Sequence, residues 1–299
     1  MTAQRLSQFL QVITIVSLAT GGLALGILKS SLNHETAIKK STHKTTKSAK
    51  TLPPVAKNLI VEVPKSLQGQ TIYHAQLKPT EKFIALTFDD GPSPKNTAQV
   101  LEILKKNQIK ATFFLIGEMV QAYPQVAKQV VADGHELGNH TWHHWYRRMD
   151  LATASSEIDR TADAIYKTTG VKTALFRPPG GYLNNGLADY AKNQNYAVMM
   201  WSSLCGDADR HIPQVPGMVN NVLKTAKPGA IVLLHDGGGN RSRTVKALPQ
   251  IIADLKAQGY KFVTASELLD IQAKEQATAA KTVPAVKKDE NLQNQPHQQ

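Results

Sequence analysis

Phe83-Ile-Ala-Leu-Thr-Phe-Asp89-Asp90-Gly91-Pro92 is the stretch of sequence on which the fold depends. Mostly apolar residues lead directly into two adjacent carboxylates, and a Gly-Pro pair ends the run. A short apolar segment bounded by turn residues is typical of a buried strand. We therefore expect Asp89 and Asp90 where a strand leaves the core, so that one carboxylate can bind a metal while the other serves as a base. The alternative at this point is an ordinary turn, because Asp and Gly are also good turn formers.

The same alternation of apolar runs and amphipathic segments continues along the chain. We predict strands over 83–88, 111–117, 135–140, 173–176, 196–202, 229–234 and 261–264, and helices over 96–106, 123–133, 153–169, 186–194, 216–226 and 244–258. Strands that alternate with helices at this spacing indicate parallel strands joined by crossover helices. A full eight-unit barrel typically needs about 250 residues, and these units span fewer. The prediction is an α/β fold, a distorted or incomplete (β/α)7-8 TIM-like barrel, with a doubly wound open sheet as the alternative.

The most conspicuous polar residues fall where the predicted strands end. They are Asp89 and Asp90, His140 and His144, Arg177, Asp207, and His235 with Asp236. In a barrel, the carboxyl ends of the strands meet at one face, and the loops on that face build the active site. Chance can place a few such residues there, but it does not readily place all of them. We therefore expect these side chains to form one site.

His140-Thr-Trp-His143-His144 offers several imidazoles within a short segment. If the segment turns helically, His140 and His144 lie on one face and can bind the same metal ion. With a carboxylate from the Asp89-Asp90 pair they form a site of two histidines and one aspartate with open positions, which is typical of a catalytic metal. The alternative is a histidine-rich surface turn, and the acids at the strand ends argue against it.

His235 follows a buried apolar run, and Arg177 precedes the stiff turn Pro178-Pro179-Gly180-Gly181. A histidine near a metal and a free carboxylate is a natural general acid, because its pKa lies near working pH. The arginine can orient a carboxylate base, and a backbone N–H of the glycine turn can face a developing oxyanion. The alternatives are a core histidine and an arginine in a surface salt bridge, which is energetically minor.

These segments resemble, in the same order, the five motifs of the polysaccharide deacetylase (NodB homology) family, carbohydrate esterase family 4. The matching segments are Thr87-Phe-Asp-Asp-Gly91, His140-Thr-Trp-His-His144, Arg177-Pro-Pro-Gly180, Trp201-Ser…Asp207 and Leu233-Leu-His235, within about residues 82–270. The resemblance implies a distorted (β/α) barrel and the metal-dependent removal of acetyl groups from N-acetylated sugars.

The resemblance also implies a role for each matching residue. Asp90, His140 and His144 correspond to the metal ligands, Asp89 to the general base, His235 to the general acid, Arg177 to the residue that holds the base, and Asp207 to the residue that tunes His235. The implied cofactor is a divalent metal, Zn²⁺ first, with Co²⁺, Ni²⁺ or Mn²⁺ as alternatives.

Two departures from the family pattern bear on substrate contacts. In the third motif the frequent tyrosine is replaced by Gly180, whose N–H is still expected to serve the oxyanion while Tyr182 fills part of the space. The fourth motif reads Leu204-Cys-Gly-Asp207-Ala208 and lacks the tryptophan that often walls the groove. Neither change removes a predicted metal ligand or proton-transfer group.

The composition is ordinary for a globular domain but strongly basic. The chain has 299 residues, a hydrophobic content of 41% and a formal net charge of +12. Between Ser31 and Asn58 six lysines face one acid, Glu35, which is typical of a solvated linker. The basic residues do not alternate with aromatic ones as in nucleic-acid-binding proteins, so we expect an anionic wall or membrane as the neighbour and no nucleic acid.

Cys205 is the single cysteine, so no internal disulfide forms and we expect it to be a packing residue.

The N-terminal segment predicts attachment to a membrane. Residues 9–28 form a mainly apolar run of twenty, long enough to span a bilayer. A cleaved signal peptide is the alternative, although its apolar core is usually about 7–15 residues. We divide the chain into a signal anchor or signal peptide (1–30), a Lys/Thr-rich linker (31–58), an N-terminal hairpin (59–81), the deacetylase domain (82–271) and a disordered tail (272–299).

The predicted function is a metal-dependent hydrolase of the cell envelope. We expect it to remove N-acetyl groups from a wall polysaccharide, first of all peptidoglycan N-acetylglucosamine. It would be anchored in the inner membrane with its domain exported, or secreted if the signal is cleaved. The alternative within the enzyme class is a deacetylase of chitin oligomers or acetyl-xylan. The alternative from another class is an inactive carbohydrate-binding module of the same fold.

Overall fold

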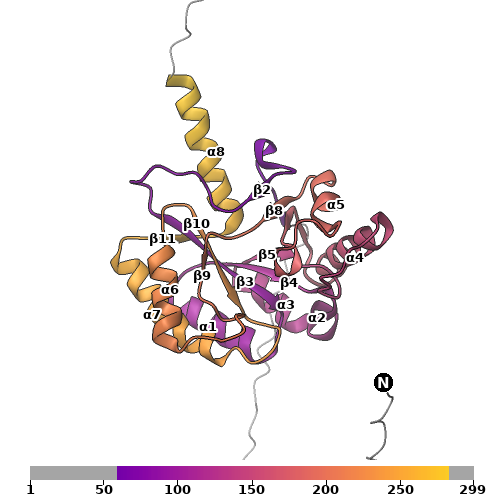
Figure 1. Ribbon diagram of the computed structural model, residues 1–299, viewed down its shortest axis with the longest axis horizontal. Coiled ribbons are helices and arrows are strands. Elements are labelled where there is room, and N and C mark those ends of the chain that lie inside the picture. The colour runs from indigo at the N-terminus through magenta and orange to yellow at the C-terminus, as the bar shows by residue number, and fades with distance from the viewer. Residues whose placement is uncertain (1–58, 283–299) are drawn as a thin grey trace, which may run out of the picture. The chain divides into compact units, whose positions relative to one another are not determined.

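The computed structural model describes residues 59–282 (Figure 1). The predicted membrane segment, the lysine-rich linker and residues 283–299 of the predicted tail lie outside this range. Within residues 59–282, no helix combines the length and the apolar character that crossing a membrane requires.

The elements alternate along the chain as the apolar pattern predicts. The strands are β1 (Leu59–Val61), β2 (Thr71–Ile72), β3 (Phe83–Gly91), β4 (Thr112–Leu115), β5 (Glu136–Asn139), β6 (Val171–Thr173), β7 (Leu175–Phe176), β8 (Ala197–Met199), β9 (Ser203–Leu204), β10 (Ala230–His235) and β11 (Lys261–Val263). The α-helices are α1 (Asn96–Asn107), α2 (Gly117–Ala122), α3 (Pro124–Ala132), α4 (Leu151–Thr169), α5 (Leu187–Asn193), α6 (Val215–Thr225), α7 (Ser242–Ala257) and α8 (Ala265–Thr282). Every helix predicted from the sequence is present, and α2 and α8 are additional.

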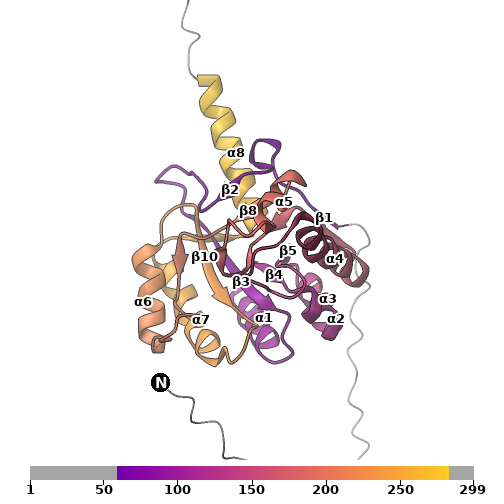
Figure 2. The same ribbon diagram turned by 45° about the vertical axis from the view of Figure 1, so that its right-hand side comes forward.

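The main sheet is a curled parallel arc. Its strand order is β2-β8-β7-β5-β4-β3-β10-β9, and β11 pairs with the first part of β3. The order leads from β2 to β9 without returning to β2 in the described chain, so the sheet is a partial barrel. The incomplete α/β barrel is confirmed, and the doubly wound sheet is not. Figures 1 and 2 show the helices outside the strands and α8 extending away from the rest.

Local sequence signals explain where these elements begin and end. All of β3 after Phe83 is buried, as its apolar run predicts. Helix α4 begins at the Asp150 cap, whose side chain accepts a hydrogen bond from Thr153 N at 2.8 Å, and it ends at Gly170 in the left-handed conformation. Pro124 occupies the first turn of α3, where its missing N–H costs no hydrogen bond.

The core lies between the sheet and its outer helices. Ile84, Leu86 and Phe88 from β3 pack in one cluster with apolar residues of α1, α6 and α7. Cys205 belongs to the same cluster and is fully buried, and burial raises the pKa of its thiol. Its predicted role as a packing residue is confirmed.

The predicted hairpin at residues 59–81 is wrong. β1 pairs in parallel with β6, and β2 pairs in parallel with β8, so the two segments join different parts of the fold. Short strands close in sequence suggest a hairpin, but each of these finds a better partner at an edge left free by the distant half of the chain.

The predicted disordered tail begins too early, because α8 continues through Thr282. A capping box fixes the start of this helix: Thr264 N donates to Glu267 Oε2 at 2.8 Å, and Glu267 N donates to Thr264 Oγ1 at 3.4 Å. Further along, Gln272 is buried and accepts a hydrogen bond from Gln76 N at 2.8 Å. The polar composition of this segment hid these tertiary contacts.

Candidate active site

A bulge in β3 turns both of its terminal carboxylates toward one cavity. The register with β4 shifts between Asp89 and Gly91, and Asp90 is the extra residue, with a φ of 71°. Alternate residues of a regular strand point to opposite faces, and a bulge re-aims one side chain at the cost of an unusual backbone conformation. Asp89 and Asp90 consequently line the same cavity of about 580 Å³. The bulge is how adjacent residues serve one site.

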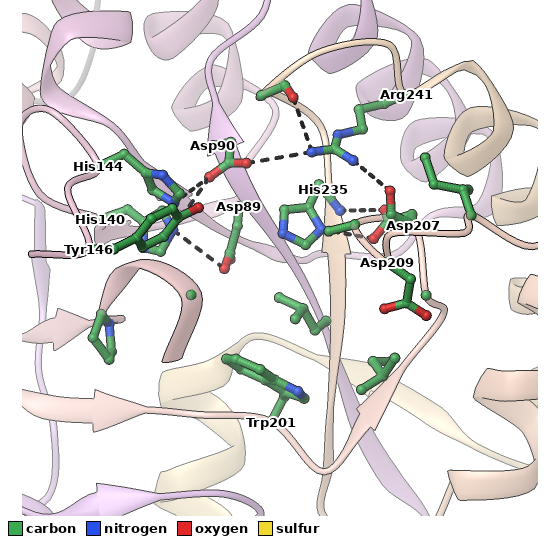
Figure 3. A pocket seen from close by; sticks show the side chains of 18 residues that line it. Asp89, Asp90, His140, His144, Tyr146, Trp201, Asp207, Asp209, His235 and Arg241 are labelled. Carbon is green, nitrogen blue, oxygen red and sulfur yellow. Dashed lines mark hydrogen bonds and ion pairs between the residues drawn. The ribbon is translucent and has the colours of Figure 1, made fainter. Parts of the chain in front are cut away.

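Asp90, His140 and His144 form what we call the metal-binding group, on the left of Figure 3. Their ligand atoms lie within 4.8 Å of one another. His144 Nε2 is 3.1 Å and His140 Nε2 is 3.5 Å from Asp90 Oδ1. His140 Nδ1 lies 2.7 Å from the carbonyl oxygen of Arg177. Donation to that carbonyl fixes the tautomer and leaves the Nε2 lone pair for a metal.

The donor set fits a metal ion. Asp90 Oδ1 is buried and has no hydrogen-bond partner within residues 59–282. Burial works to raise the pKa of Asp90, but the nearby imidazoles of His140 and His144 outweigh it and hold that pKa below its usual range. An ionised oxygen that meets imidazole nitrogens at this spacing is what a divalent cation coordinates. The predicted ligands are therefore brought together.

The segment 140–144 does not turn helically, yet His140 and His144 meet as predicted. Thr141 and His144 have positive φ values of 67° and 61°, so the segment is an irregular loop. His143 points elsewhere, with its Nδ1 2.5 Å from Glu157 Oε1. Glu157 also accepts hydrogen bonds from the backbone N–H groups of Trp142 and His143. Through these hydrogen bonds, the buried Glu157 of α4 fixes the backbone of the histidine loop.

Asp89 is held by Arg177. The Nη1 of the fully buried arginine donates to Asp89 Oδ1 at 2.7 Å and to Thr87 Oγ1 at 2.8 Å. The remaining guanidinium nitrogens donate to the carbonyl oxygens of Met199 and Met200. A buried ion pair is tolerated only when its polar atoms are satisfied in this way. Asp89 Oδ2 remains 3.7 Å from His140 Nε2 and faces the metal-binding group.

Asp207 and His235 form the proton-donor group on the other side of the cavity (Figure 3). The parallel register places His235 directly opposite Asp89. His235 Nδ1 lies 2.8 Å from Asp207 Oδ1, and Asp207 Oδ2 accepts from His235 N at 2.8 Å and Thr244 Oγ1 at 2.9 Å. Burial works to lower the pKa of His235, but the hydrogen bond and the charge of Asp207 outweigh it and raise that pKa. Asp207 thus favours the protonated imidazole and engages Nδ1, and among residues 59–282 no hydrogen bond engages Nε2.

Of the other two predicted site residues, Gly180 lines the cavity and has a φ of 60°, whereas Tyr182 is not among the lining residues. Tyr182 packs beside Tyr146, with ring centroids 5.6 Å apart. Trp201 also lines the cavity.

Sequence reasoning did not identify Tyr146, Glu157 and Arg241. Tyr146 and Arg241 line the cavity, and Glu157 supports the histidine loop. A signal for Arg241 was available, because it closes a glycine-rich loop that begins two residues after His235. Glu157 lies within α4, and nothing in the neighbouring sequence indicates that its side chain contacts the histidine loop.

A family model described as polysaccharide deacetylase matches residues 76–199 of the chain. The peptidoglycan-N-acetylglucosamine deacetylase of Bacillus cereus is 47% identical over 194 residues, which cover 63% of this chain and 89% of that protein. The bifunctional xylanase/deacetylase of Pseudobutyrivibrio xylanivorans is 44% identical over 197 residues, 64% of this chain but only 31% of that longer protein.

Solved structures show the same fold. The structure of BA3943, a pseudoenzyme of family CE4 from Bacillus anthracis, superimposes with a TM-score of 0.63 at 32% identity, over 69% of this chain and 71% of that one. The arrangement of elements is therefore compatible with an inactive protein. Activity depends on the site residues of a chain and not on this fold alone.

Proposed function

The chain belongs to the polysaccharide deacetylase family, and we propose that it removes N-acetyl groups from N-acetylglucosamine residues of peptidoglycan. One observation carries the proposal. The metal-binding group, the Asp89–Arg177 pair and the proton-donor group all face one cavity. An inactive binding module of this fold has no need to keep a base, an acid and a ligand set together. The Bacillus cereus relative, which is named for peptidoglycan N-acetylglucosamine, supports peptidoglycan as the first substrate.

The metal that we propose is Zn²⁺. Two imidazole nitrogens and one carboxylate oxygen are the usual protein ligands of a catalytic zinc, which keeps a position open for water or substrate. When bound, such an ion would polarise the amide carbonyl and lower the pKa of a water molecule. Reconstitution of the metal-free protein with Zn²⁺, Co²⁺, Ni²⁺ or Mn²⁺ tests this assignment of the metal. Greater acetate release with another ion would contradict zinc as the preferred metal.

The residues of the chain supply proton transfer. Asp89, whose orientation is fixed by Arg177, takes a proton from the attacking water. Gly180 N–H at the cavity rim faces the oxygen on which negative charge develops. His235, which Asp207 orients and whose pKa Asp207 raises, gives a proton to the leaving amine nitrogen. Without that proton the amine is a poor leaving group.

The test is acetate release by the full chain from peptidoglycan, chitin oligomers and acetyl-xylan, with zinc and after treatment with a chelator. We expect metal-dependent release, greatest from peptidoglycan. Acetyl-xylan is the second candidate because of the xylanase/deacetylase relative. Absence of release from all three substrates by zinc-loaded protein would contradict the deacetylase proposal.

We also propose that the enzyme works on the outer side of the inner membrane, tethered by residues 9–28. The length of this apolar run supports the tether, and the outer side is the side on which the proposed peptidoglycan substrate lies. Fractionation of cells, combined with protease added from outside, tests it. Full-length protein in the soluble fraction would refute the tether.

A further inference from the structure

Exposed apolar side chains gather around the mouth of the active-site cavity. Tyr146, Leu204 and Ile212 line the cavity and are 54%, 39% and 38% exposed. Tyr182, also 54% exposed, packs against Tyr146. The floor of the same cavity carries the charged residues. Exposed apolar side chains that gather beside a polar site mark a candidate binding surface.

Two of these side chains, Tyr146 and Tyr182, pack against each other, and we call this pair the tyrosine ledge. A Cβ atom added at Gly180 would lie 2.9 Å from the Tyr182 ring and 3.0 Å from the Tyr146 ring, so both rings cover this glycine. The Tyr146 ring also meets the ring of His144, with centroids 5.2 Å apart. The tyrosine ledge therefore contacts the metal-binding group at His144 and extends over Gly180, the predicted oxyanion donor.

We propose that the tyrosine ledge binds the sugar next to the one that loses its acetyl group. This inference rests on the proposed deacetylase function, which places the reacting sugar at the metal-binding group. A pyranose ring with equatorial substituents presents a flat face of C–H groups, and an aromatic ring is the protein surface that matches it. Leu204 and Ile212 provide the apolar counterpart on the wall formed by the segment after β8. The favoured substrate is then an oligomer.

The experiment measures kcat/KM for β-1,4-linked N-acetylglucosamine from the single sugar to the pentamer. The proteins are wild type, Tyr182→Ala and, as the matched control, Tyr123→Ala. Tyr123 is an exposed tyrosine between α2 and α3 and does not line this cavity. Wild-type kcat/KM should rise with length. Tyr182→Ala should lose about threefold to tenfold on the longer substrates, the scale of an aromatic contact, and little on the single sugar. Tyr123→Ala should match wild type.

An equal effect of Tyr182→Ala on every length, or no effect, would overturn the ledge. If wild type releases acetate from no substrate, the proposed function fails first, and calorimetric binding of the tetramer decides the ledge. Weaker binding by Tyr182→Ala than by Tyr123→Ala would then support it. Equal binding by the two variants, or none, would reject it.

A second inference concerns Arg241 and stands on separate contacts. Its side chain is buried, and Figure 3 shows it between Asp90 and Asp207. Nε donates to the carbonyl oxygen of Gly237 at 2.6 Å, Nη1 to that of Asp207 at 2.6 Å and Nη2 to that of Gly238 at 3.2 Å. One guanidinium thus joins the loop after β10 to the loop that carries Asp207.

Arg241 also faces the metal-binding group. Its Nη2 lies 3.7 Å from Asp90 Oδ2, whereas both imidazoles approach Oδ1. Gly238, at a φ of 65°, makes room for this approach, because a Cβ there would lie 2.3 Å from Asp90 Oδ2. We infer that Arg241 is a positioning residue that occupies one oxygen of Asp90 and presents the other to the metal.

The test compares zinc affinity, by competition with a coloured chelator, in Arg241→Met, Arg241→Lys and Arg243→Met. Arg243 is the matched control, since it lies two residues after Arg241, in α7, and donates to the carbonyl oxygens of Ile212 and Pro213. Arg241→Met should weaken binding about 10- to 100-fold, the usual loss when a group that orients a metal ligand is removed. Arg241→Lys should recover part of the loss, because charge returns without the planar fork. Arg243→Met should bind as wild type does.

Unchanged affinity in a folded Arg241→Met would reject the positioning role. If circular dichroism shows that this variant does not fold, Arg241→Lys decides: affinity weakened at least threefold relative to Arg243→Met supports the role, and equal affinity rejects it.

Discussion

Two groups of aspartate and histidine face the same cavity. The protein satisfies the hydrogen-bonding capacity of the carboxylate in one group but not in the other. In the proton-donor group, both oxygens of Asp207 accept hydrogen bonds from His235 and Thr244. In the metal-binding group, Asp90 Oδ1 lacks a hydrogen-bond partner among the described residues, although two imidazole nitrogens lie within 3.5 Å. A carboxylate that is fully hydrogen-bonded orients a neighbour. One that is buried and unsatisfied is a receptor for a cation.

The largest effect should follow from breaking the metal-binding group. His144→Ala removes a metal ligand, and we expect a loss of zinc and a fall in kcat of at least ~10³-fold, because a metal contributes several kcal/mol to such a reaction. His143→Gln is the control, since His143 pairs with Glu157 outside the metal-binding group. Bound zinc is counted by atomic absorption. A His144→Ala protein that keeps its zinc would contradict the ligand assignment.

Breaking the proton-donor group should lower activity without releasing the metal. His235→Ala removes the proposed general acid, and we expect kcat to fall ~10²- to 10⁴-fold, the usual contribution of general acid–base catalysis. Zinc affinity should stay as in wild type, because His235 is not among the ligands. Equal rates in variant and wild type would remove His235 from the mechanism.

The comparison is sharpened by pH. Asp207 raises the pKa of His235, so the acid stays protonated to higher pH than an ordinary histidine does. Asp207→Asn should therefore move the alkaline limb of the kcat profile to lower pH. The same sign holds for stability: the stabilising contribution of the pair through His235 is present below the ordinary pKa of histidine and is lost as pH rises through the raised value. An alkaline limb that stays in place would show that another group controls it.

The smallest effect should come from a single neutral donor. Thr244→Val removes one hydrogen bond from Asp207 and leaves the two from His235. A neutral hydrogen bond contributes about 0.5–1.5 kcal/mol, so we expect kcat to fall a few-fold, with zinc affinity unchanged. A loss as large as that of His235→Ala would mean that the group depends on Thr244 far more than its geometry implies.

Much of this site could be predicted because its residues follow apolar runs. Periodicity located the strands, and the rule for parallel sheets brought Asp89, His140, Arg177 and His235 to one face. The features of the site that the pattern did not predict depend on contacts between residues distant in the sequence. The bulge at Asp90 is specified against β4, and Arg241 matters only because the Asp207 loop lies beside it. The parallel partners of β1 and β2 were hidden for the same reason.

The left-handed conformation of Asp90 restricts which sequences can keep this site. A backbone with a φ of 71° is tolerated by Asn and Asp much better than by most other residues. Glutamate could supply the same charge, but its longer side chain gains no such tolerance, while asparagine fits the backbone and lacks the charge. Geometry and coordination chemistry together leave aspartate as the residue that meets both demands. The backbone conformation alone therefore restricts which residues can replace Asp90, in addition to the restriction that activity imposes.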